Sequence, residues 1–183
     1  MKISDVHVHL HMYNPEDGTK FFDMLYNKNV THVNIVTATL TSANLYAARE
    51  FENTYGLWMK RDYKKCDLYV YGGIHEVGAF KDVAYVDQLI YLLKAGCDGV
   101  KFLNMKPNIR KTYGRGINDS CYDELFKAME EMGVPALIHS KDPESFWHKE
   151  LMLPEHIEYG WCYDAEGFKT FDEIHNETLE RLD

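Results

Sequence analysis

Apolar runs of strand length alternate with amphipathic stretches along the whole chain. Residues 83–95 show the helical pattern most plainly, with apolar side chains at the i, i+3, i+4 and i+7 positions of one face: Val86, Leu89, Ile90 and Leu93. The pattern predicts strands at residues 2–10, 31–37, 67–75, 99–104 and 134–139. It predicts helices at residues 19–27, 42–61, 83–95, 119–132 and 171–182, and a short helix that ends at Trp147.

These strand and helix patterns repeat as a unit of about 30–35 residues. Strands separated by helices of this length pair in parallel through right-handed crossovers. Two α/β architectures fit, an open doubly wound sheet and a (β/α)8 fold of the TIM-barrel type. No G-x-G-x-x-G follows the first strand, which disfavours a dinucleotide-binding sheet. A complete barrel takes about 250 residues, so a barrel here would be truncated to about five β/α units.

The composition is that of a globular protein, with 183 residues of which 45% are hydrophobic and 27% charged. The net charge of −9 argues against nucleic acid or an anionic membrane as a partner, because both attract Lys and Arg. No apolar run approaches the ~20 residues of a membrane helix, and no secretory apolar segment precedes the first strand. The cysteines lie far apart, at Cys66, Cys97, Cys121 and Cys162, which predicts free thiols and a cytoplasmic protein.

Three histidines alternate with apolar residues in the first predicted strand. Successive side chains of a strand point to opposite faces. The apolar face would therefore hold Val6, Val8 and Leu10, and the polar face Asp5, His7, His9 and His11. In a parallel barrel such a polar face points towards the C-terminal mouth, where several imidazoles can bind one metal ion. We expect His7 and His9 to be metal ligands, whereas His11 lies either on the strand or already in the loop.

A fourth histidine, His139, ends the last predicted strand, within GVPALIHSKDP. This is the place for a third metal ligand at the mouth of a parallel sheet. A lone histidine there is more often a hydrogen-bonded core residue, but the H-x-H of the first strand favours the ligand interpretation.

Lys101 lies within an apolar strand, where an unpaired ammonium is costly. Three interpretations are open. The ammonium points at a substrate carboxylate or at Glu76 or Asp5, or it is carbamylated and bridges two metal ions, or its stem extends to the rim. A polar role in a pocket ranks first, and Lys101 is predicted to bind substrate.

His75 and Glu76 end the third predicted strand, and His75 is a second candidate for substrate binding. Residues 106–116 predict a long basic loop, which either covers a pocket or is simply solvated. The remaining histidines receive no role: His32, His148, His156 and His175.

The D-x-H-x-H of residues 5–9 resembles the start of the amidohydrolase superfamily of metal-dependent barrel enzymes. The GVKF around Lys101 and the PALIHSKDPESFW of residues 135–147 are similar to its decarboxylase-like branch, which includes relatives of aminocarboxymuconate-semialdehyde decarboxylase. The resemblance covers the whole chain as the first five β/α units of the barrel. It implies a divalent metal, usually Zn²⁺, held by His7, His9 and His139, and a metal-activated water as nucleophile. Mn²⁺, Fe²⁺ or Ni²⁺ also suit such ligands.

The resemblance also implies a histidine after strand six and a catalytic aspartate after strand eight. This chain ends at Asp183, within what is predicted to be the helix before strand six, so no residue here is assigned to the aspartate's role. We therefore expect one partial domain over residues 1–183, completed either by a missing C-terminal half or by association into a homo-oligomer.

Three functions remain open on this scaffold. The first is a metal-dependent hydrolase that attacks an amide, ester or related carbon centre of a small molecule. The second is a metal-dependent decarboxylase of a small unsaturated or aromatic carboxylic acid. The third is a non-catalytic half-barrel that keeps its histidines as relics.

Overall fold

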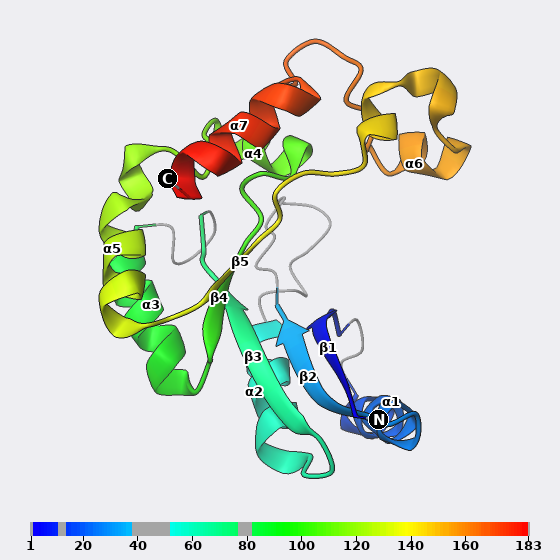
Figure 1. Ribbon diagram of the computed structural model, residues 1–183, viewed down its shortest axis with the longest axis vertical. Coiled ribbons are helices and arrows are strands. Elements are labelled where there is room, and N and C mark those ends of the chain that lie inside the picture. Colours follow the sequence, from blue (N-terminus) through cyan, green and yellow to red (C-terminus); the bar gives the residue numbers. More distant parts are fainter. Residues whose placement is uncertain (1, 11–13, 38–51, 77–81, 183) are drawn as a thin grey trace. The chain divides into compact units, whose positions relative to one another are not determined.

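A computed structural model describes residues 2–10, 14–37, 52–76 and 82–182. Five strands form one sheet in the order of the sequence (Figure 1). They are β1 (Ile3–Val8), β2 (Val30–Val36), β3 (Asp67–Gly73), β4 (Gly99–Phe102) and β5 (Ala136–Ile138). The pairs β1–β2, β2–β3 and β3–β4 are parallel. Sequential parallel strands with helices between them confirm the predicted fold class, a partial (β/α)8 barrel of about five units.

Helices follow each strand. The longer ones are α1 (Pro15–Asn27), α2 (Glu52–Asp62), α3 (Tyr85–Ala95), α5 (Asp123–Met132) and α7 (Phe171–Leu182). The shorter ones are α4 (Pro107–Tyr113), α6 (Pro154–Glu158) and the 3₁₀ turns Ser120–Tyr122, Glu144–Trp147 and Lys149–Leu151. The first part of the predicted helix at 42–61 lies outside the described residues, and so does His11. None of the described helices has the length and apolar character needed to cross a membrane.

The chain divides into two compact units, and each draws on two stretches of sequence. The first unit comprises Met1–Lys101 and Lys127–Leu137, and the second comprises Phe102–Phe126 and Ile138–Asp183. The first unit thus carries His7, His9, His75 and Lys101, whereas the second carries His139.

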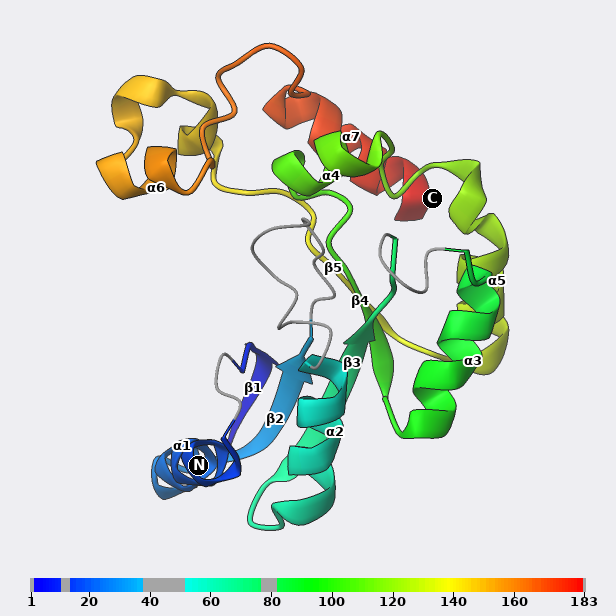
Figure 2. The same cartoon turned by 180° about the vertical axis from the view of Figure 1, so that it is seen from behind.

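The core of the first unit lies between the strands and the helices that follow them. Val33 and Ile35 on β2 and Val70 on β3 are completely buried. The helix α2 lies against β2 and β3, and Gly56 permits the approach, because a Cβ there would lie 3.3–3.4 Å from side chains of Ile35 and Val70 (Figure 2). Apolar burial of this kind contributes about 25 cal/mol per Å² and holds the strand ends in place.

Local sequence signals explain most element boundaries. The helix α1 begins at Pro15, earlier than the predicted residue 19, because Asn14 accepts a hydrogen bond from the Glu16 amide and so caps the helix. The helix α3 ends at Gly96, whose φ of 108° is easy only for glycine.

The predicted basic loop at residues 106–116 is wrong, because its centre is the helix α4. Its Pro107 occupies the first helical turn and Gly114, with φ 72°, follows the last residue. Both residue types are usual at these two helix ends, so the same residues that indicated a loop are the start and stop of a short helix.

The second unit has a separate core around α7. Tyr122, Leu125, Ile117 and Ile174 are completely buried. A bidentate salt bridge joins α4 to α7, with Arg110 Nε and Nη2 each 2.6 Å from a Glu177 oxygen. Since both side chains are largely buried, this bidentate pair fixes the two helices against each other.

Candidate functional site

The first strand keeps the predicted alternation at residues 7–10, where His7 and His9 are exposed and Val8 and Leu10 are buried, but not before them. Asp5 pairs with Val33 but Val8 pairs with Ile35, so β1 contains one residue more than β2 over this step. Such a β-bulge turns the residues inside it. Val8 is buried as predicted, but Val6 is 65% exposed, which corrects the prediction that it lies on the buried face.

Side chains fix this bulge from both sides. The Asp5 Oδ1 accepts a hydrogen bond from the His7 amide at 3.1 Å, and the buried Asn34 donates through Nδ2 to the Val6 carbonyl at 3.2 Å. The Oδ1 of Asn34 has no hydrogen-bond partner among the described residues. A polar residue in the middle of the apolar run THVNIV was the sequence signal for this anchor, and it was missed.

The imidazoles of His7 and His9 lie close together on the exposed face of this segment. Their Nε2 atoms lie 3.1 Å apart and their ring centroids 4.9 Å apart, and both residues are exposed. Two nitrogens that bind one zinc ion at about 2.0–2.1 Å in tetrahedral geometry lie about 3.3–3.4 Å apart. The pair therefore has a geometry that suits either a shared proton or a shared metal ion.

His139 lies in the second unit, at the end of β5, where its amide donates to the Phe102 carbonyl. Its Nε2 is 2.8 Å from Asp142 Oδ1. The same carboxylate accepts hydrogen bonds from Lys106 Nζ at 2.9 Å and from the Tyr163 hydroxyl. We call these four residues the Asp142 network.

Burial and the neighbouring polar groups act on the pKa of Asp142 in opposite directions. Burial raises the pKa of Asp142, but the hydrogen bond from His139 and the charge of Lys106 outweigh it and hold that pKa well below its usual range. Burial and the hydrogen bond to this carboxylate raise the pKa of the Tyr163 hydroxyl. Since a carboxylate only accepts, His139 Nε2 donates in this hydrogen bond, and Nδ1 is the ring nitrogen left for another partner.

Lys101 is the buried cation of the first unit. It is 3% exposed, so its stem does not extend to the rim. The described part of the chain gives its ammonium no acidic partner, and burial lowers its pKa to about 8. Neither Glu76 nor Asp5 makes an ion pair with it there, so a substrate group and carbamylation stay as the two remaining interpretations.

His75 follows β3, whose Gly73 pairs with Lys101, so both predicted substrate residues lie at the C-terminal end of neighbouring strands. Gln88 of α3 clamps the His75 backbone, accepting from its amide at 2.8 Å and donating to its carbonyl at 3.1 Å. His75 lines a cavity of about 270 Å³ whose walls are mainly apolar. Glu76 is held by the Tyr85 hydroxyl at 2.7 Å.

The structure thus brings together His7 and His9 in one unit and places His139 in the Asp142 network of the other. Over the described residues of each unit, taken by itself, no three His, Cys, Asp or Glu side chains gather in a way that could hold a metal ion. The three-histidine ligand set draws on both units and remains a prediction.

Sequence reasoning missed Asp142, Lys106 and Tyr163. Asp142 follows His139 by three residues, a short-range signal that was available. Lys106 and Tyr163 lie 36 and 21 residues from Asp142 in the sequence, and nothing in the pattern linked them.

Comparisons with known proteins support the fold. The chain is similar to a crystal structure described as an amidohydrolase II, with a TM-score of 0.57 and 14% identity. The match covers 98% of this chain and 60% of the length of that one. No protein-family model and no curated protein matches the sequence. At this identity the likeness shows the fold alone.

Proposed function

We propose that this chain carries the metal-binding part of a metal-dependent hydrolase of the amidohydrolase type. The observation that carries the proposal is the pair of Nε2 atoms of His7 and His9, 3.1 Å apart at the C-terminal end of the first strand of a parallel β/α sheet. Ligands at the C-terminal ends of such strands are where enzymes of this architecture place their chemistry. The proposed reaction is attack of water on an amide, ester or related carbon centre.

His7 and His9 would hold the metal through Nε2, and His139 would contribute Nδ1, because its Nε2–H is engaged by Asp142. Zn²⁺ is the proposed ion, and Mn²⁺, Fe²⁺ and Ni²⁺ are also compatible with imidazole ligands. When bound, such an ion lowers the pKa of a water molecule and polarises a carbonyl oxygen. Asp142 orients the His139 ring in this scheme.

Lys101 and His75 are proposed to orient the substrate. A buried ammonium without an acidic partner among the described residues attracts a carboxylate strongly, because little water screens it. This observation also favours a second candidate function, decarboxylation of a small unsaturated or aromatic carboxylic acid. Release of carbon dioxide from a panel of such acids, set against hydrolysis of amides and esters, separates the two.

Metal binding tests the proposal most directly. The full chain is loaded with Zn²⁺, and its stoichiometry and affinity are measured by isothermal titration and elemental analysis. We expect one ion per chain, and roughly tenfold or greater loss of affinity in His7→Ala and in His9→Ala, because each removes a ligand.

The matched control is His148→Ala, which removes an exposed histidine that has no proposed role and should leave the affinity unchanged. Equal Zn²⁺ binding by all of these proteins would overturn the proposal. The non-catalytic half-barrel would be favoured instead by a stable chain that binds no metal and whose free energy of unfolding does not change when a chelator is added.

A further inference from the structure

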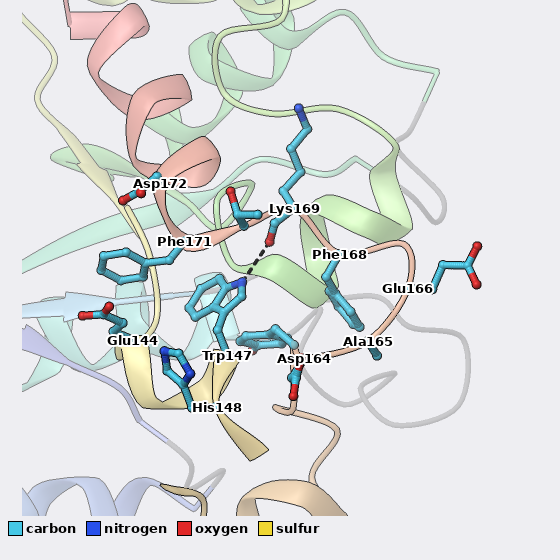
Figure 3. Close-up of a pocket in the computed structure, with 12 residues that line it drawn as sticks. Glu144, Trp147, His148, Asp164, Ala165, Glu166, Phe168, Lys169, Phe171 and Asp172 are labelled. Carbon is cyan, nitrogen blue, oxygen red and sulfur yellow. Dashed lines mark hydrogen bonds between the residues drawn. The ribbon is translucent and has the colours of Figure 1, made fainter. Parts of the chain in front are cut away.

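The second unit contains a cavity of about 540 Å³ between the 3₁₀ turn Glu144–Trp147 and the start of α7 (Figure 3). This volume lies within the usual range of about 300–1,000 Å³ for small-molecule sites. Aromatic rings form its wall, with centroid separations of 5.0 Å for Trp147–Tyr163, 5.4 Å for Trp147–Phe171 and 5.1 Å for Tyr163–Phe168.

The polar tips of these aromatic residues are already used. Trp147 Nε1 donates to the Lys169 carbonyl at 2.8 Å, and the Tyr163 hydroxyl donates to Asp142. What the partly exposed Trp147 offers to a ligand is therefore the ring itself, whose face carries partial negative charge, while the buried Tyr163 ring supports it.

Two other residues with donors at the cavity, Lys169 and Thr170, are engaged as well. The Lys169 ammonium is 3.2 Å from a Glu177 oxygen and 3.6 Å from a Glu173 oxygen. The Thr170 amide and hydroxyl both donate to Glu173, and the Glu173 amide donates back to the Thr170 hydroxyl, a capping box at the start of α7. The N-terminus of α7 is thus closed by its own carboxylate and offers no anion site.

Carboxylates complete the lining. Glu144, Asp164 and Asp172 are exposed and have no basic partner among the residues the structure describes. Figure 3 draws Glu144 and Asp172 to the same side of Trp147 as the Phe171 ring. The cavity therefore presents ring faces and negative charge, but few free donors.

Ring faces of this unit already accept ammonium groups from the chain itself. Lys141 Nζ lies 3.8 Å from the centre of the Phe171 ring, and Lys111 Nζ lies 4.3 Å from the centre of the Phe168 ring. Both rings also line the cavity. These contacts are cation–π interactions, and they show which kind of charge the rings accept.

We infer that this cavity binds a small organic ammonium compound with an apolar body, such as a quaternary or aryl-alkyl amine. The rings would hold the apolar part and the charge-bearing methyl or methylene groups, while Glu144 and Asp172 balance the charge. The inference does not depend on the proposed function, because no metal ligand takes part.

Isothermal titration of the full chain tests the inference, with a chelator present so that metal plays no part. The probes are benzyltrimethylammonium, choline and 3,3-dimethylbutan-1-ol, the uncharged carbon analogue of choline. We expect saturable binding of benzyltrimethylammonium, and roughly tenfold weaker binding of the neutral analogue than of choline, because only the charge differs.

Two double variants locate the site. Glu144→Gln/Asp172→Asn should weaken benzyltrimethylammonium binding roughly fivefold or more. The matched control, Glu155→Gln/Glu158→Gln, removes the same charge from exposed positions of α6 and should leave the binding unchanged. Absence of saturable binding, equal binding of choline and its neutral analogue, or equal effects of the two double variants would overturn the inference.

Discussion

The two histidine-bearing regions of this molecule differ in how their side chains are held. His7 and His9 are exposed at the end of β1, and His7 lies within a backbone bulge that Asp5 and Asn34 hold through hydrogen bonds. His139 instead belongs to the Asp142 network, where one buried carboxylate accepts from three side chains. The first arrangement leaves the rings accessible to a ligand, whereas the second fixes a ring through its own hydrogen bond.

The comparison indicates that a histidine and its neighbours contribute differently to the stability of the fold in the two regions. An exposed imidazole contributes little to folding, so it can be kept for chemistry alone. Removal of a buried charge lowers the free energy of unfolding more, because each of its buried partners is then left without a hydrogen bond. Substitutions in the two regions should therefore separate effects on stability from effects on ligand binding.

The largest effect is expected for Asp142→Ala. This change leaves the Lys106 ammonium and the Tyr163 hydroxyl without their acceptor, and the Lys106 side chain is only 17% exposed. We expect the free energy of unfolding to fall by about 3–5 kcal/mol, as when one partner of a buried ion pair is removed. Urea denaturation measures it, with Asp164→Ala as the exposed control. A loss of unfolding free energy no larger than that of the control would show that the Asp142 network does not stabilise the fold.

Glu177→Gln tests whether removal of other buried charges in the second unit also lowers its stability. The substitution keeps the size of the side chain but removes the charge that Arg110 contacts at two oxygens. One of the two bonds then faces an amide nitrogen, so we expect a loss of about 2 kcal/mol, measured by urea denaturation. Asp172→Asn, at an exposed position of the same helix that makes no ion pair among the described residues, is the control. A loss equal to that of the control would confine the sensitivity to the Asp142 network.

The repeating part of the fold could be predicted from the sequence because its signals are local. Strand positions agree with the prediction to within a few residues, and the last helix was predicted with its observed bounds, Phe171–Leu182. The helix α4 was missed because proline and glycine mark loops and helix ends alike. The β1 bulge was missed because strict alternation was assumed, and the Asp142 network because its members are distant in sequence.

Lys101→Met should raise the free energy of unfolding, whereas Asp142→Ala and Glu177→Gln lower it. The buried ammonium of the first unit has no acidic partner in the described part of the chain, so its burial costs free energy. We expect the methionine variant to be more stable by about 1–2 kcal/mol at pH 7, and to lose any substrate-dependent activity. The two proteins are compared by urea denaturation.

The pH dependence of this difference follows from the lowered pKa. Between pH 8 and the ordinary value of 10.5 the unfolded wild-type chain binds a proton at Lys101 that the folded chain does not. The stability of the wild type therefore rises with pH in this window, and the advantage of the variant shrinks. A constant advantage from pH 7 to pH 10.5 would show that Lys101 is not titrating, as a carbamylated lysine would not.

The smallest change in the free energy of unfolding is expected for substitutions at the β1 bulge, next to His7 and His9. Val8 is 8% exposed and Val6 is 65% exposed, although strict alternation would bury both. Val8→Thr places a hydroxyl in the core and should cost about 1–2 kcal/mol, whereas Val6→Thr should change stability by less than about 0.5 kcal/mol. Threonine suits a strand as valine does, so the pair reports burial rather than strand propensity. Equal losses at the two positions, measured by urea denaturation, would mean that β1 alternates regularly.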